Sequence, residues 1–129
     1  MAKARKITET FWGLIDQGDY DTLSSLFAAD CDIVYPGISS AFAGTYKGRA
    51  GAETLFKKLF VEVVRTATDV ELLENDDHNN VISAVTESGI YKTKPFNLKW
   101  LLLFATKGEL IVKAEIFTDT ELTAVIFPK

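Results

Sequence analysis

The segment from residue 18 to residue 51 constrains the fold of this chain more than any other part of the sequence. It reads GDYDTLSSLFAADCDIVYPGISSAFAGTYKGRAG. Gly18 can adopt the left-handed conformation that ends a helix, and Pro36 ends a strand because it cannot donate a ladder hydrogen bond. The segment therefore predicts, in fixed order, a helix end, a short second helix, a strand ending at Pro36 and a short strand over residues 42–46.

Three helices are expected, each from apolar residues that recur every three or four positions. The first covers residues 3–17, and an aspartate at position 19 or 21 can cap the second, which closes at Asp30. The third follows Gly48 and continues to about residue 66. Its polar face carries Glu53, Lys57, Lys58, Glu62 and Arg65.

The rest of the chain is expected to form strands over residues 68–75, 81–92, 96–106 and 109–119. Hairpin turns separate them, so neighbouring strands pair antiparallel. With 129 residues, of which 47% are hydrophobic, the chain has the size for one domain over residues 1–129 with one core. The pattern predicts an α+β fold whose helices pack on one face of the sheet.

Composition excludes several classes of partner. The net charge of -4 and the scattered basic residues argue against binding to nucleic acid. Cys31 is the single cysteine, which excludes an intramolecular disulfide and fits a cytoplasmic setting. Neither a signal peptide nor a membrane span is expected. Asp76, Asp77 and His78 have metal-ligand chemistry, but they read as an exposed polar turn, so no metal and no cofactor is expected.

Alternation along the last two strands separates an inner from an outer face. The inner face of the first of these strands is expected to carry Phe96, Leu98, Trp100, Leu102 and Phe104. The core is expected to take the apolar set of the second, namely Leu110, Val112, Ala114 and Ile116.

Glu115 then points outward with Lys113, where the two can pair with Lys99 and Glu87 of neighbouring strands. The alternative places Glu115 inward, as an acid or base in an apolar cavity where burial favours its neutral form.

In its residues and their spacing, the segment over residues 18–51 resembles the NTF2-like superfamily, in particular the branch of ketosteroid isomerases, SnoaL-like polyketide cyclases and limonene epoxide hydrolases. The resemblance implies a cystatin-like cone in which three N-terminal helices pack on a curved antiparallel or mixed sheet. It also implies a pocket between the helices and the sheet. One fold hosts many chemistries, so function depends on the residues of the site.

The positions that carry ketosteroid isomerase chemistry in that branch hold other residues here. The resemblance implies a carboxylate base immediately before the proline that ends the first strand, and Tyr35 stands there. The oxyanion tyrosine corresponds to Phe11, and the protonated aspartate to Trp100. Isomerisation of the steroid type is therefore not expected.

The cyclases and epoxide hydrolases carry an acidic residue on the last strand. Glu115 and Asp119 stand in the corresponding stretch, where Asp119 is expected to cap the closing segment. The epoxide hydrolases also need an arginine and a second aspartate on the penultimate strand, and FNLKWLLLFAT has neither.

These observations predict a pocket for a small hydrophobic molecule. Its expected lining is Phe11, Trp12, Tyr35, Tyr46, Trp100, Leu102 and Phe104. If the protein is an enzyme, the resemblance implies isomerase, lyase or polyketide-cyclase chemistry on a hydrophobic ring compound, with Glu115 and Tyr35 as candidate catalytic residues. The phenols of Tyr35 and Tyr46 can instead be structural.

The alternative function is a non-catalytic interaction module. In this interpretation the outer face of the sheet forms a homodimer through Leu101, Leu103 and Ile111. A homodimer that also has a pocket satisfies both interpretations and is the expected combination.

Overall fold

The computed structural model describes residues 3–75 and 78–129. In these ranges the elements are α1 (Lys3–Gln17), α2 (Tyr20–Ser24), β1 (Phe27–Tyr35), β2 (Gly44–Lys47), α3 (Gly48–Val61), β3 (Val64–Glu74), β4 (Asn80–Tyr91), β5 (Lys94–Lys107), β6 (Leu110–Phe117) and α4 (Thr120–Ile126). The strands form one sheet in the order β2-β1-β6-β5-β4-β3. The β1–β6 pair is parallel and the other pairs are antiparallel, so the sheet is mixed.

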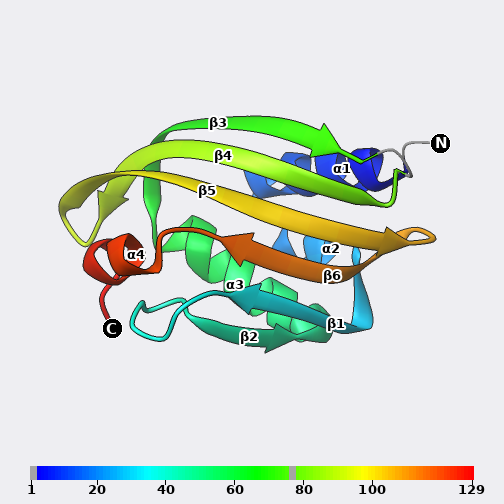
Figure 1. Ribbon diagram of the computed structural model, residues 1–129, viewed down its shortest axis with the longest axis horizontal. Coiled ribbons are helices and arrows are strands. Elements are labelled where there is room, and N and C mark those ends of the chain that lie inside the picture. The colour runs from blue at the N-terminus through cyan, green and yellow to red at the C-terminus, as the bar shows by residue number, and fades with distance from the viewer. Residues whose placement is uncertain (1–2, 76–77) are drawn as a thin grey trace.

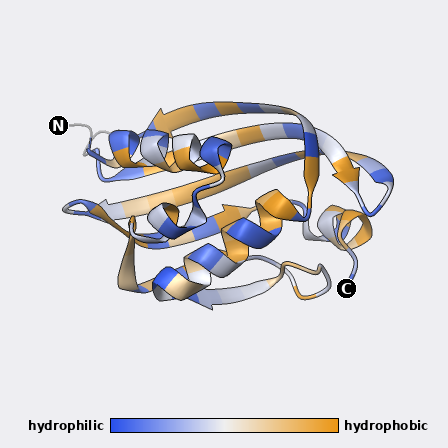
Figure 2. Ribbon diagram, turned by 180° about the vertical axis from the view of Figure 1, so that it is seen from behind, coloured by the Kyte–Doolittle hydropathy of each residue, from blue (hydrophilic) through white to orange (hydrophobic). Residues whose placement is uncertain are grey.

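Helices α1, α2 and α3 cover one face of the curved sheet, and α4 lies at one end of it near the C-terminus (Figure 1). The hydrophobic stripes of α1 and α3 face the sheet, whereas their hydrophilic residues face outward (Figure 2). The expected α+β fold is confirmed. Within the described ranges, no helix has the length and apolar character needed to cross a membrane.

The second helix is shorter than the sequence predicts, because β1 already begins at Phe27, within the stretch expected to close the helix at Asp30. Phe27 was expected in the helix, but it is the first residue of β1 and is fully buried. The Ile111 amide donates to the Leu26 carbonyl at 2.8 Å, and the Arg49 guanidinium donates to the Phe27 carbonyl at 3.1 Å. Pairing with β6 therefore determines the conformation of this stretch against its helical spacing.

Helix α3 likewise ends at Val61 rather than near residue 66. Residue Val64 already pairs with Ile90 of β4, and Arg65 pairs with Gly89. Arg65, which the sequence predicts on the polar face of the helix, is consequently the second residue of β3. This change moves its side chain from solvent to the interior.

An aromatic cluster fills the core between the helices and the sheet. The Phe11 ring lies 4.9 Å from the rings of Phe56 and Phe104, measured between centroids, and 6.4 Å from that of Phe27. All four side chains are fully buried. Burial of such a ring stabilises the fold by roughly 1.5–3 kcal/mol.

A β-bulge in β6 changes which side chains face the core. Ala105 pairs with Lys113, but the next residue of β5, Thr106, pairs with Ile111, so Val112 is the extra residue. Ile111 is therefore fully buried and Val112 is exposed. The prediction that Ile111 belongs to the outer face, with Val112 in the core, is wrong for this reason.

Candidate functional site

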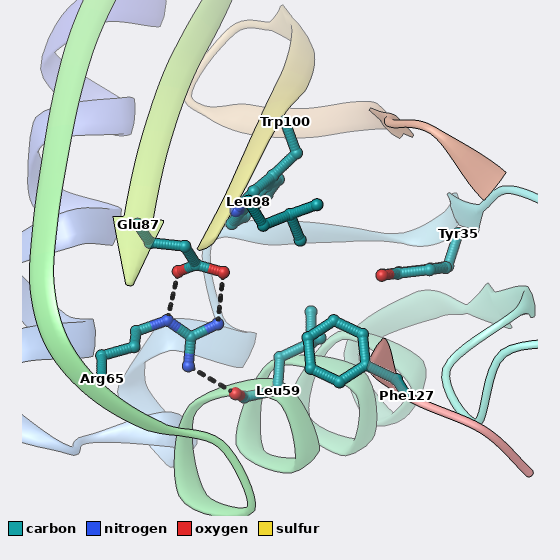
Figure 3. Close-up of a pocket in the computed structure, with 7 residues that line it drawn as sticks. All are labelled: Tyr35, Leu59, Arg65, Glu87, Leu98, Trp100 and Phe127. Carbon is teal, nitrogen blue, oxygen red and sulfur yellow. Dashed lines mark hydrogen bonds and ion pairs between the residues drawn. The ribbon is translucent and has the colours of Figure 1, made fainter. Parts of the chain in front are cut away.

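A small apolar cavity between α3, the sheet and the C-terminal segment contains an ion pair, a phenol and an indole N–H (Figure 3). Its volume is about 10 Å³, the space of a single water molecule. The residues that line it are Tyr35, Leu59, Arg65, Glu87, Leu98, Trp100 and Phe127.

Strand β4 places Glu87 in this cavity. Glu87 lies on the same face of β4 as the buried residues Val85 and Tyr91, because an even number of positions separates them. It pairs with Leu98 of β5. The Glu87 side chain is 1% exposed. The prediction that Glu87 belongs to an outward-facing row of charges is therefore wrong.

The guanidinium of Arg65 neutralises this carboxylate. Its Nε donates to Glu87 Oε2 at 2.5 Å, and its Nη2 donates to Glu87 Oε1 at 3.4 Å. Its Nη1 donates to the carbonyl of Leu59 at 2.7 Å and to that of Val63 at 3.3 Å. The guanidinium also lies 4.2 Å from the centroid of the Phe60 ring, in a cation–π contact.

Two further polar groups reach the cavity from other strands. The Nε1 atom of Trp100 is buried and has no hydrogen-bond partner. The hydroxyl of Tyr35 points into the cavity from the side opposite Arg65 (Figure 3). Burial, reinforced by the negative charge of Glu87, raises the pKa of the Tyr35 phenol well above its usual value. The phenol therefore stays neutral as a hydrogen-bonding group.

Of the residues expected to line a pocket, the structure brings Tyr35 and Trp100 together at the cavity. The side chains of Phe11, Leu102 and Phe104 are instead fully buried in the packed core. The aromatic residues thus fill most of the space that the sequence suggested for a ligand.

Trp12 and Tyr46 do not line this cavity and have hydrogen-bond partners of their own. The indole N–H of Trp12 donates to the Ser83 hydroxyl at 2.9 Å, which joins α1 to β4. The Tyr46 hydroxyl donates to the Phe42 carbonyl at 2.9 Å. Of the two roles expected for the Tyr46 phenol, the structure therefore shows the structural one.

Glu115 lies on the outer face of the sheet, where its side chain is 32% exposed and lies 3.8 Å from Lys113 Nζ. The inward orientation, on which an acid–base role for Glu115 depends, is not the arrangement of the structure. Asp119 caps α4, because its carboxylate accepts a hydrogen bond from the Leu122 amide at 3.0 Å.

The polar turn gives no support for a metal site. The His78 imidazole lies on the surface, 3.4 Å from Glu74 Oε1. Asp76 and Asp77 lie outside the described residues, and among the described residues no cluster of three or more histidine, cysteine or acidic side chains is arranged to hold a metal.

Arg65 and Glu87 are the functional candidates that the sequence alone did not indicate. The hairpin between β4 and β5 indicates the position of Glu87, because it pairs Glu87 with Leu98, a residue expected on the inner face. No sequence pattern indicates the inward position of Arg65, because that position depends on where α3 ends.

No protein-family model matches the sequence, and no curated protein matches it either. Solved structures do match. An NTF2-like protein from Burkholderia xenovorans superposes with a TM-score of 0.81 at 21% identity, over 97% of this chain and 95% of that chain. Bal32a, from a soil-derived mobile gene cassette, superposes with a TM-score of 0.80 at 20% identity, over 97% of this chain and 96% of that chain.

A third similar structure is SalBIII, described as an epoxide hydrolase/cyclase-like enzyme with a role in pyran ring formation in the polyether salinomycin. It superposes with a TM-score of 0.73 at 17% identity, over 94% of this chain and 96% of that chain. The chain therefore has the NTF2-like fold that its sequence segment predicts.

Proposed function

We propose that this protein binds a small hydrophobic molecule at the cavity between α3 and the sheet. The observation that carries the proposal is the convergence of the Arg65–Glu87 ion pair, the Tyr35 phenol and the unpartnered Trp100 N–H on one apolar cavity. Ligand sites are typically apolar with a small number of polar groups that fix orientation.

The energetics of the ion pair support a functional interpretation. Removing two charges from water costs more than a buried pair usually regains, so apolar residues of the same size would give an equally stable core. The lone indole donor is also costly, because a buried N–H without a partner loses its hydrogen bond to water. These costs are compensated when a ligand oxygen occupies the cavity.

If the site is catalytic, Glu87 is the group we propose for proton transfer. It is the one carboxylate among the residues that line the cavity, and Trp100 and Tyr35 line the same cavity as hydrogen-bond donors. Proton abstraction next to a carbonyl needs this combination of a base and donors to the developing oxyanion. Isomerase-type and cyclase-type reactions both belong to this class.

The test is a titration with planar phenols and ketones, in which isothermal titration calorimetry measures the heat of binding. We expect a saturable change in the wild type and its loss in Trp100→Phe, which removes the free N–H but keeps an aromatic ring. Leu73→Ala, at an exposed position of β3 away from the cavity, is the matched control and retains the response. The proposal fails if no compound of either kind produces a change at millimolar concentration.

A second proposal concerns the outer face of the sheet. Leu101 and Phe117 are paired residues of β5 and β6, and they are 39% and 44% exposed. The Lys113–Glu115 pair on the same face gives both signs of charge, which suits a self-complementary contact with a second copy of this chain. We therefore propose a homodimer through this face.

Sedimentation velocity tests the homodimer. The wild type is expected to sediment as a dimer and the double variant Leu101→Lys/Phe117→Lys as a monomer. Val125→Lys, at an exposed position of α4, is expected to stay dimeric. A monomeric wild type at the highest soluble concentration overturns this proposal and leaves the ligand site unaffected.

A further inference from the structure

Strand β3 is the last strand of the sheet, so within the described residues one of its edges has no neighbouring strand (Figure 1). The strand is 11 residues long, whereas strands of about 5–6 residues are the commonest. Residues 67–74 include neither lysine nor proline, the residues that commonly protect such an edge. The bulge between Arg65 and Ala67 lies before this stretch. The edge can therefore accept another strand.

The register of the β3–β4 pair determines which backbone groups face the open edge. At the end of this pair, the Asn75 amide donates to the Asn80 carbonyl at 3.3 Å. In an antiparallel pair, hydrogen-bonded residues alternate with residues whose backbone groups point away. The residues two, four and six positions before Asn75 therefore bond to β4. The N–H and C=O groups of Thr68, Val70 and Leu72 point to the open edge.

The side chains at the same positions border an apolar groove. This surface groove has a volume of about 610 Å³ and lies between α1, the end of α3 and the start of β3. Thr68 and Val70 line it together with Trp12, Ile15 and Phe60. Residues directly opposite each other on paired strands have their side chains on the same face. An added strand thus places every second side chain on the face of the sheet that borders the groove.

The opposite face of β3 is acidic. Asp69 and Glu71 are exposed, and neither has an ion-pair partner among the residues that the structure describes. A side chain opposite either one on an added strand has its Cβ atom at about 4.5–5.5 Å, where opposite charges stabilise the pair. The side chains that alternate with the apolar ones are therefore expected to be basic.

The same charges disfavour a second copy of this chain at the edge. If two β3 strands pair antiparallel about Val70, Asp69 of each copy lies opposite Glu71 of the other. Like charges directly opposite each other on paired strands are destabilising. A basic partner strand has no such repulsion.

We propose that the open edge of β3 binds an extended segment of a partner protein as an added antiparallel strand, in which apolar residues alternate with lysine or arginine. The apolar residues lie opposite Thr68, Val70 and Leu72, and the basic residues lie opposite Asp69 and Glu71. In this mode of recognition, main-chain hydrogen bonds supply affinity and alternate side chains supply specificity. The proposal does not depend on ligand binding in the cavity.

Fluorescence anisotropy with three fluorescein-labelled peptides tests the chemistry of the partner. We expect GSVKVKVSG to bind at least about 10-fold more tightly than GSVEVEVSG, which reverses the charges, and GSVVKKVSG, which has the same composition without the alternation. Equal or tighter binding of either control peptide overturns the proposal. So does the absence of GSVKVKVSG binding at millimolar protein concentration.

Methylation of single peptide amides tests the strand addition without any change to the protein. The amide of the central valine of GSVKVKVSG donates to the Val70 carbonyl in the proposed pairing, whereas the lysine amides point away from β3. N-methylation of the central valine is therefore expected to weaken binding by at least about 10-fold. N-methylation of one lysine is the matched control and is expected to cost less than about 3-fold. Equal losses in the two peptides contradict an added strand.

Charge reversal on the protein tests the location. Asp69→Lys/Glu71→Lys is expected to bind GSVEVEVSG more tightly than GSVKVKVSG. Glu109→Lys/Glu121→Lys changes the net charge equally at exposed positions outside β3 and is expected to keep the wild-type order. If both double variants change the order alike, net charge rather than the β3 edge selects the peptide, and the proposal is wrong. None of these four residues lines the cavity, so that result leaves the proposed function unaffected.

Discussion

The Glu87 carboxylate and the Arg65 guanidinium form an ion pair inside the protein, with the Glu87 side chain 1% exposed and the Arg65 side chain 12% exposed. Both residues belong to the paired strands β3 and β4, since Arg65 pairs with Gly89 and Glu87 pairs with Thr68. The pair is therefore held by the sheet and not by a mobile surface loop. Arg65 borders both the interior cavity and a surface groove between α1, the end of α3 and the start of β3.

Removal of one partner from this pair is expected to destabilise the protein strongly. Arg65→Met leaves a buried carboxylate without a counter-charge, which lowers the free energy of unfolding by roughly 3–5 kcal/mol. The double variant Arg65→Met/Glu87→Met removes both charges and is expected to be more stable than the single variant. Urea denaturation of both proteins at neutral pH measures the difference. A single variant that unfolds at the wild-type urea concentration would show that the carboxylate escapes to solvent.

The phenol that the ketosteroid isomerase resemblance assigns to position 11 does not suit this core. Phe11 is fully buried among the rings of Phe27, Phe56 and Phe104. Phe11→Tyr adds a hydroxyl among these rings and is expected to lower the free energy of unfolding by about 1–3 kcal/mol. Phe11→Leu is the control for lost volume. A Phe11→Tyr protein as stable as the wild type would mean that the hydroxyl reaches a polar partner.

The succession of helices and strands could be predicted from sequence because hydrophobic periodicity and turn residues are local signals. Gly18 has a φ of 70° and ends α1 as expected, and the Asp19 carboxylate accepts from the Thr22 amide at 3.0 Å. The inner face of β5 also follows from simple alternation.

The errors arise where tertiary pairing overrides a local pattern. Phe27 continues the helical spacing of α2, yet pairing with β6 makes it the start of a strand. Ile111 and Val112 exchange faces because of a bulge that alternation does not reveal. The site depends on both kinds of information, since Tyr35 and Trp100 follow from strand patterns but Arg65 depends on the exact end of α3.

Asp119 is expected to act as a helix cap. Its carboxylate accepts from the Leu122 amide, and α4 leads directly to Phe127, which lines the cavity. Asp119→Ala is expected to lower the free energy of unfolding by roughly 0.5–2 kcal/mol, whereas Asp119→Asn keeps a capping oxygen and costs less. Thermal unfolding measures both. Equal loss of stability in the two variants would argue that the negative charge itself, rather than the cap, is required.

The buried phenol of Tyr35 is expected to make the protein less stable at alkaline pH. Burial raises its pKa above the ordinary value of 10.0, so above that pH the unfolded chain loses a proton that the folded chain keeps. The contribution of Tyr35 to stability is complete below pH 10.0 and declines as the pH rises toward the folded pKa, by at most about 1.4 kcal/mol per pH unit. Urea denaturation over this pH range should therefore show a steeper decline for the wild type than for Tyr35→Phe. Burial also raises the pKa of the Cys31 thiol to about 11, but Cys31 is present in both proteins and its titration cancels in the comparison. Parallel curves would mean that the Tyr35 hydroxyl ionises as freely in the folded protein as in the unfolded chain.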